Sequence, residues 1–263
     1  MKNKYRILKI FVVVVLLAFL LNFSLNRFNG KKLEDVRIQM IQSEPVQFVS
    51  DRDIRGMVKH TNPEMKIGTL DIPGLEKQLR TLPSVDSANV YLNLNGTLNL
   101  DIKQRVPVMR VNNGSQNYYV DRDGTEFPLS PHYAHPCMLV SGHIPKDDYK
   151  GIVQLIDAIN SDKFTKRFFV GIARHNDSYF LLTDDGNYKV ELGGLERPAY
   201  KLKGFKTFLE KYLVYQNPQK YSKVSLRFDN QIVTTLRKGF TSELDSLMKQ
   251  PIVNEIAPGM GAD

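Results

Sequence analysis

The stretch DIKQRVPVMRV, residues 101–111, is where one hydrophobic pattern ends and another begins. Up to Ile102 the apolar residues occupy even-numbered positions and alternate with polar ones, as in a half-buried strand. Pro107 lacks a backbone donor, which confines it to the edge or the end of a sheet. After it, Met109 and Val111 move the apolar residues to odd positions, and such a phase change turns side chains to the opposite face of a strand. The stretch therefore predicts the end of one sheet and immediate entry into a second core.

The seventy or so residues before this point predict the order strand, helix, helix, strand, strand. Ser50 and Asp53 have capping-box spacing, with Asp in place of the usual Glu or Gln, and Asp71 can cap a second helix. The Asn95-Gly96 pair between two alternating segments is a strong hairpin signal. We expect strands at 35–41, 85–94 and 97–104, and helices at 50–60 and 71–82.

The residues after Pro107 predict a second, strand-rich region with two longer helices. The helix at 149–160 carries its isoleucines on one face, and the helix at 199–216 repeats apolar residues at helical spacing. The expected strands lie at 108–111, 117–121, 138–141, 168–173, 179–182, 188–192, 224–228 and 232–236. From Gly239 on, Pro, Gly and polar residues indicate a loose tail, with one or two amphipathic turns at 240–248. The fold class is therefore α+β.

The amino-terminal segment Ile10–Leu21 is uninterrupted and apolar. Twelve residues also fit the core of a cleaved signal peptide, so that alternative stays open. No small-x-small cleavage site follows, and residues 7–25 would form a helix of roughly 28 Å, close to the thickness of a bilayer core. We expect a retained anchor at 10–25, between a tail at 1–9 and a linker at 26–34. Four basic residues precede it and three follow, which places the amino end in the cytoplasm.

The net charge of +8 does not indicate nucleic-acid binding. Residues 1–32 contain seven basic residues and no acidic one, so the remainder carries 29 Lys and Arg against 28 Asp and Glu. A nucleic-acid surface needs a clustered basic face, and the body shows no such run. Nucleic acid is therefore excluded as an expected partner.

Motifs for catalysis or cofactor binding are not found, since the sequence has no P-loop, His-Glu-x-x-His or Gly-x-Ser-x-Gly. Gly193-Gly194 before the long helix could cradle an anion, but an unstrained exit from a hairpin explains it better. His132, His135, Cys137 and His143 are ligand types within twelve residues, without the spacing of structural zinc sites. With one cysteine, no intramolecular disulfide forms. We expect no catalytic residue, metal or cofactor.

The first region resembles the POTRA domain. The resemblance is carried by FVSDRDI (48–54), LPSVDSANV (82–90) and QRVP (104–107). In that family the last strand commonly ends in Glu-Arg-x-Pro. Gln104 stands in place of the Glu, so any salt bridge made by that acid is absent.

The second region resembles the β-domain of the bacterial cell-division family FtsQ/DivIB. YYVDRDGTEF (118–127) is similar to its opening hairpin, and residues 190–205 and 224–233 are similar to its long-helix lead-in and a later strand. Ser225 and Phe228 replace an Asp and a Tyr there. The resemblance implies a single-pass inner-membrane protein with a POTRA domain at 35–106, a β-domain at 107–238 and a tail at 239–263.

The implied function is a non-enzymatic scaffold on the extracytoplasmic (periplasmic) side. It would bind FtsB/FtsL-like single-span proteins at the division septum and help to localise and regulate septal peptidoglycan synthesis. A first alternative is a POTRA-containing assembly factor for outer-membrane or secreted proteins, which normally needs a long run of barrel strands. A second is a membrane-tethered hydrolase, for which the sequence predicts no polar triad.

The expected partner site is the edge of the last strand, 232–236, where a partner segment adds as an extra strand. A tight turn at Asp229-Asn230 precedes it. The alternative is that residues 240–248 of the tail cover this edge. The predicted partner-binding residues are Phe228, Asn230, Gln231, Ile232, Val233, Thr234 and Thr235.

The retained anchor gives a first prediction. Because no small-x-small site follows Leu21, mass spectrometry of the membrane-extracted protein should find a chain that begins near Met1. A mature form that starts between Asn22 and Lys31 would show that the segment is a cleaved signal.

Overall fold

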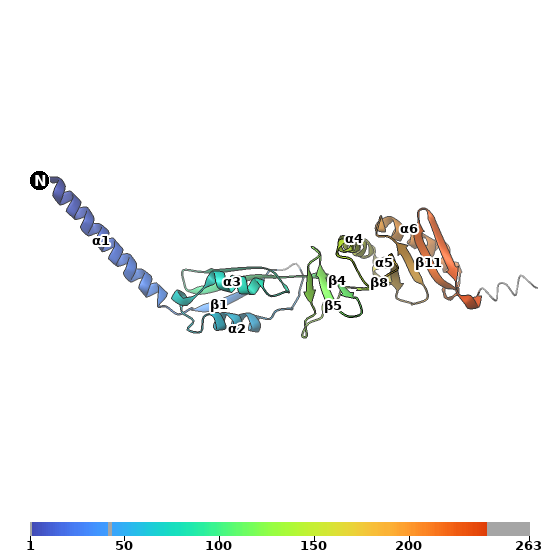
Figure 1. The fold of residues 1–263 in the computed structure, drawn as a ribbon, viewed down its shortest axis with the longest axis horizontal. Helices are drawn as coiled ribbons and strands as arrows, with labels where there is room; N and C mark the ends of the chain where they lie inside the picture. The colour runs from blue at the N-terminus through green and yellow to red at the C-terminus, as the bar shows by residue number, and fades with distance from the viewer. Residues whose placement is uncertain (1, 42–43, 241–263) are drawn as a thin grey trace, which may run out of the picture. The chain divides into compact units, whose positions relative to one another are not determined.

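The computed structural model describes residues 2–41 and 44–240, and Figure 1 labels its elements along the chain. Helix α1, Lys2–Asn29, comes first. Its segment Tyr5–Asn29 is long and apolar enough to cross a membrane, and it is the one such helix in the described part of the chain. The length and composition of α1 are those expected of an anchor.

The next elements match the strand-helix-helix-strand-strand order expected from the sequence. The three strands form a sheet in the order β1-β3-β2, with β1 parallel and β2 antiparallel to β3. The elements are β1 Asp35–Met40, α2 Asp51–Thr61, the 3₁₀ turn η1 Ile67–Thr69, α3 Ile72–Arg80, β2 Val85–Leu92 and β3 Thr97–Gln104.

Both helices of this region begin at the residues that the sequence indicates. The Ser50 hydroxyl accepts a hydrogen bond from the Asp53 N–H, and the Asp53 carboxylate accepts one from the Ser50 N–H, so the capping box is complete. The hydrogen bond from the Ser50 hydroxyl also holds the pKa of Asp53 below its usual value. Asp71 caps α3 through the N–H of Gly74. The caps place Leu75 of α3 against the sheet, where its side chain is fully buried.

Gln104 fastens the segment between β1 and α2 to the end of β3. Its side chain is buried, and Oε1 accepts a hydrogen bond from the N–H of Val49 at 2.9 Å. Its amide nitrogen lies 3.4 Å from the carbonyl oxygen of Val49 and 3.5 Å from that of Val46. An amide can donate and accept, whereas an ionised carboxylate only accepts. The residue that replaces the expected Glu therefore makes contacts that a carboxylate could not.

Replacing Gln104 by Glu should lower the free energy of unfolding of this region by about 1–3 kcal/mol at neutral pH. A buried carboxylate facing two carbonyl oxygens has a folded-state pKa above the unfolded value of about 4.3. The loss should therefore grow as the pH rises from about 4.3 to that raised pKa. Below about pH 4.3 the acid is protonated in both states and can donate, so the loss should disappear. Urea-dependent hydrogen exchange of the amides of β3 measures it.

The matched control is Gln47→Glu, the same chemical change at an exposed position between β1 and α2. It should change stability by less than about 0.5 kcal/mol at any of these pH values. Equal stabilities of the two variants at neutral pH would show that Gln104 does not depend on its amide donor.

The chain after β3 changes phase as the sequence predicts. In β3 the even-numbered apolar residues are fully buried, whereas in β4, Pro107–Asn112, the odd-numbered residues are buried. The strand begins at Pro107 itself, one residue earlier than expected. A proline is tolerated there because a first strand residue need not donate to the ladder.

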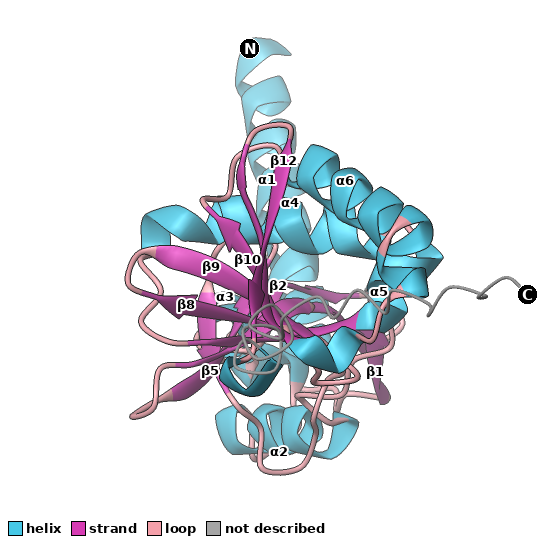
Figure 2. Cartoon of the chain, turned by 90° about the vertical axis from the view of Figure 1, so that its right-hand side faces the viewer, coloured by secondary structure: helices cyan, strands magenta, loops and turns pink. Residues whose placement is uncertain are grey.

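The second region is a mixed nine-stranded sheet in the order β12-β11-β10-β9-β8-β7-β4-β5-β6. Its helices α4 and α6 are seen beside the sheet in Figure 2. The remaining strands are β5 Asn117–Asp121, β6 Glu126–Pro128, β7 Met138–Ser141, β8 Phe169–His175, β9 Ser178–Thr183, β10 Lys189–Gly193, β11 Tyr221–Phe228 and β12 Gln231–Leu236. The helices are α4 Tyr149–Asn160, α5 Lys163–Phe168 and α6 Pro198–Lys211, with 3₁₀ turns η2 Lys146–Asp148, η3 Leu213–Tyr215 and η4 Pro218–Lys220.

A single row of aliphatic side chains crosses this sheet. Each member is the register partner of the next on the neighbouring strand, and each is completely buried. The row consists of Val111, Val140, Ile172, Leu181, Val190 and Val224. Buried residues of α4 and α6, such as Ile156 and Phe205, belong to the same core. Both helices therefore cover one face of the sheet.

The prediction of an α+β fold is confirmed, with two short elements that the sequence did not indicate. Strand β6 has three residues, too few to show a period. Helix α5 has six residues and begins at Asp162, whose carboxylate accepts hydrogen bonds from the N–H groups of Phe164 and Thr165. Three α-helices therefore accompany the sheet where two were expected.

The chain divides into two compact units. One comprises residues 1–107 with Phe127–His135, and the other Val108–Glu126 with the chain from Pro136 on. In the first unit the ring of Phe48 lies edge-on to Phe127 at 5.5 Å and to Tyr133 at 4.9 Å. The domain limits 35–106 and 107–238 remain predictions, and of the turns expected at 240–248 all but Phe240 lie outside the described residues.

Candidate functional site

Strand β12, where the sequence places the partner site, is the last strand at one end of the nine-stranded sheet. It pairs antiparallel with β11 across the turn Asp229–Asn230, as expected. Asn230 has φ of 60°, a conformation that Asn tolerates better than most residues. In the described part of the chain no strand lies beyond β12, so one row of its backbone N–H and C=O groups faces outward.

The buried row of the sheet reaches β12 at Thr234, the register partner of Val224. Thr234 is only half-buried, whereas the six other residues of the row are completely buried. Its neighbour Val233 pairs with Ser225 and points to the other face, because side chains alternate along a strand. Thr235 and Gln231 are exposed.

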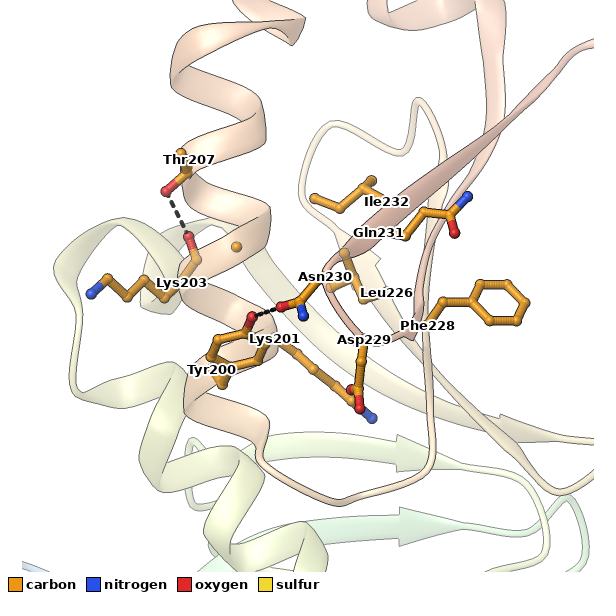
Figure 3. A pocket seen from close by; sticks show the side chains of 11 residues that line it. Tyr200, Lys201, Lys203, Thr207, Leu226, Phe228, Asp229, Asn230, Gln231 and Ile232 are labelled. Carbon is orange, nitrogen blue, oxygen red and sulfur yellow. Dashed lines mark hydrogen bonds between the residues drawn. The ribbon is translucent and has the colours of Figure 1, made fainter.

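A hollow of about 430 Å³ lies between α6 and the β11–β12 hairpin (Figure 3); we call it the hairpin groove. The residues that line it come from the first three turns of α6 and from the hairpin. They are Tyr200, Lys201, Lys203, Gly204, Thr207, Leu226, Phe228, Asp229, Asn230, Gln231 and Ile232.

Two contacts tie the hairpin turn to α6. The Tyr200 hydroxyl donates a hydrogen bond to Oδ1 of Asn230, and the Arg197 guanidinium lies 2.5 Å from the Asp229 carboxylate. The hydrogen bond that Arg197 donates to Asp229 lowers the pKa of Asp229 and raises the pKa of Arg197. Arg197 also lies over the ring of Tyr200, at 5.6 Å from its centroid. These exposed contacts set the position of the turn more than they stabilise the fold.

Four of the predicted partner residues line the groove and three do not. Phe228, Asn230, Gln231 and Ile232 line it, whereas Val233, Thr234 and Thr235 follow along β12. Figure 3 shows Ile232 directed toward α6 and the ring of Phe228 directed away from it. Phe228 is 53 % exposed, whereas Ile232 is partly buried against the core. The side chains of Phe228 and Ile232 therefore point in different directions, although both residues line the groove.

The groove residues that come from α6 were not predicted from the sequence, although the sequence contains a signal for them. Tyr200, Lys203, Gly204 and Thr207 follow the same 3.6-residue spacing as the apolar stripe of α6, on the opposite face. A face with a glycine and a threonine leaves room beside the helix. A Cβ added at Gly204 would meet no atom within 4 Å.

The Gly193–Gly194 turn carries a structural role. Gly193 has φ of 76°, and the carbonyl oxygen of Gly194 accepts a hydrogen bond from Nζ of the buried Lys201 at 2.9 Å. Lys201 also donates to the carbonyl of Leu192 and to Glu196. The Glu196 carboxylate lies where a Cβ on Gly194 would be, so the chain's own acid occupies the space of the anion considered earlier.

The His and Cys residues of the loop before β7 show no arrangement for metal binding. His135 Nδ1 lies 3.1 Å from the Tyr133 hydroxyl, and burial lowers the pKa of His135. Burial raises the pKa of the Cys137 thiol to about 11, so it is not a reactive thiolate at neutral pH. Across residues 2–41 and 44–240, no group of three or more His, Cys, Asp or Glu side chains could hold a metal ion.

A second cluster of ionisable side chains surrounds the start of α4. The Tyr149 hydroxyl donates to Glu126 at 2.8 Å and lies 2.9 Å from the Tyr118 hydroxyl. The Tyr179 hydroxyl donates to Asp148 at 2.5 Å. Burial raises the pKa of Tyr149 and of Tyr179, which keeps both phenols neutral. These side chains act as hydrogen-bonded supports of the fold.

Residues 106–235 match the sequence model of a family described as "FtsQ/DivIB, C-terminal related". None of the curated proteins compared with the chain matches it. Among solved structures, the major extracytoplasmic domain of the trans isomer of the cell-division protein DivIB from Geobacillus stearothermophilus is 12 % identical. That comparison covers 43 % of this chain and 98 % of the DivIB domain, with a TM-score of 0.31.

Two helix glycines with opposite surroundings give a stability prediction. Gly204→Ala should raise the free energy of unfolding by about 0.5–1 kcal/mol, because Ala is the better helix former and the new Cβ meets open space. Gly151→Ala on α4 is the control, since its Cβ would lie 2.8 Å from Cδ1 of Leu195. Thermal unfolding measures both. A loss of stability in Gly204→Ala would show that the space beside Gly204 is filled, and an equal gain in Gly151→Ala would show that Leu195 moves aside.

Proposed function

We propose that the chain is a member of the FtsQ/DivIB family, whose role is in cell division, and that it is a non-enzymatic scaffold of the division machinery. The match of residues 106–235 to the FtsQ/DivIB-related sequence model supports this. It binds FtsB/FtsL-like single-span proteins and thereby helps to localise and regulate septal peptidoglycan synthesis. The observation that carries the proposal is the open edge of β12 beside the hairpin groove.

Backbone pairing supplies the affinity in this proposal. An extended partner segment adds to β12 as a tenth strand and satisfies the outward-facing N–H and C=O groups. Such pairing is tolerant of sequence because it uses main-chain atoms. The exposed Arg237 and Lys238 just after the strand discourage indiscriminate pairing.

Side chains in the groove supply the specificity. A strand added to β12 presents every second side chain to the α6 side of the sheet, where the groove opens beside Ile232. Gly204 and Thr207 leave room there, while Tyr200 holds the turn in place through Asn230. The exposed ring of Phe228 provides a second, separate contact.

The family and α1 together support a membrane-anchored protein. We propose that α1 crosses the inner membrane once, with the amino end in the cytoplasm and the body in the periplasm at the septum. The family match favours this reading over an outer-membrane assembly factor or a tethered hydrolase.

Proline in β12 tests the proposal. Consecutive N–H groups of a strand point to opposite edges, so one of Val233 and Thr234 donates toward β11 and the other toward the open edge. Proline at the outward-donating position should weaken binding of the FtsB-like partner about tenfold or more, because it removes one intermolecular donor and disturbs the strand. Pull-down with the full-length protein measures this, with circular dichroism to confirm folding.

Two further variants separate the backbone from the groove. Thr234→Val keeps every backbone donor and extends the buried row, so it should bind as the wild type does. Gly204→Leu fills the groove without a clash at Cβ and should reduce binding while the fold remains stable. If folded proline variants at both positions retain wild-type affinity, the partner surface lies elsewhere.

A further inference from the structure

Three segments of the first unit meet directly after α1. The N–H of Leu33 donates to the carbonyl of Met65 at 2.7 Å, and the N–H of Ile67 donates to the carbonyl of Lys31 at 3.0 Å. The N–H of Glu34 donates to the carbonyl of Gly96 at 3.0 Å. Residues 31–34, 62–67 and 93–96 therefore form one hydrogen-bonded end of the unit, which we call the anchor-proximal end.

This end gathers lysines from two distant segments. Lys32 and Lys66 are direct partners in an antiparallel bridge, and Lys31 precedes Lys32. Like charges directly opposite each other are unfavourable in a folded chain. Glu64 pairs with Lys66 at 2.8 Å, but both side chains remain largely exposed. With three lysines (Lys31, Lys32 and Lys66) against two acids (Glu34 and Glu64) in these segments, this end carries a net charge of +1, which favours an anionic partner.

The same end exposes a leucine that has no role in the core. Leu94 lies at the tip of the β2–β3 hairpin and is 93 % exposed. The tip is well ordered by hydrogen bonds, from Asn93 N–H to the carbonyl of Thr97 and from Gly96 N–H to the carbonyl of Asn93. A hydrogen-bonded turn that exposes a leucine at the same end of the unit as the lysines has the chemistry of a membrane-surface contact.

Distance makes a lipid surface the fitting partner. If the apolar part of α1 ends near Leu25, the helix end at Asn29 lies roughly 6 Å farther along the axis. The headgroup layer is about 5–8 Å thick on each side. Lys31 and Lys32 then lie at its outer boundary, within one Debye length of about 8 Å.

We propose that the anchor-proximal end rests on the membrane surface, with Lys31, Lys32 and Lys66 on anionic phospholipid headgroups and Leu94 in the interfacial layer. The inference rests on the proposal that α1 spans the membrane, and it holds for either orientation of α1. It gives the first unit a second attachment besides the anchor itself.

The chain contains no tryptophan, so a single introduced one is an unobstructed probe. We place it at Leu94 (Leu94→Trp) or, as the control, at exposed Ser87 of β2, roughly 23 Å back along the strand. Full-length protein is reconstituted in nanodiscs of anionic phospholipid that carry a headgroup nitroxide quencher. Quenching of the Leu94→Trp protein should be at least twice that of the Ser87→Trp protein, with blue-shifted emission.

The lysines are tested in the Leu94→Trp background. Changing Lys31, Lys32 and Lys66 to Gln, or using zwitterionic lipid, should at least halve the amount by which quenching at position 94 exceeds quenching at position 87. A control with the same charge loss at the exposed Arg52, Lys59 and Lys77 should leave it unchanged.

Each outcome decides one point. Equal quenching at positions 94 and 87 overturns the membrane contact, and quenching that ignores lipid charge and the lysine changes overturns the assignment of the lysines. Co-elution of the chain with the nanodiscs reports the anchor alone, so failure of the α1 proposal is distinguished from failure of this one.

Discussion

The structure of the second unit depends on the row of six aliphatic side chains that crosses its sheet from Val111 to Val224. Six of the nine strands contribute one fully buried residue each to the row, which belongs to the same core as the buried residues of α4 and α6. A shift of any strand by one residue would turn its member of the row to the other face of the sheet. The row therefore sets the register of six strands, and with it the place at which the helices can pack.

The same row explains why the candidate site lies where it does. Its seventh position is Thr234 of β12, which the helices cover only in part. The hairpin groove lies between α6 and the start of β12. The hydrogen bond from Tyr200 to Asn230 joins the hairpin turn to α6 beside it. An open backbone edge and a side-chain hollow next to each other are the two requirements of strand addition, the first for affinity and the second for selectivity.

Hydrogen bonds of two different kinds hold the two ends of the first unit together. At one end the side-chain amide of Gln104 forms hydrogen bonds with backbone groups of Val46 and Val49. At the other end, the residues after α1 bond to the loops around Met65 and Gly96. The chain thus joins its anchor to the folded unit through paired backbone groups, which is what places charged and apolar side chains together at that end.

The order and type of the longer elements were determined by the sequence itself, because caps, turns and periodicity are local. Ser50 with Asp53, Asn95 with Gly96, and the phase change at Pro107 act over a few residues and behave in the structure as they read in the chain. Strand order was decided only by the tertiary structure, since the parallel pairs β10–β11 and β4–β7 join segments far apart. The hairpin groove was likewise decided only by the tertiary structure. The side chains of α6 and of the β11–β12 hairpin come together only when α6 packs on the sheet that contains the hairpin.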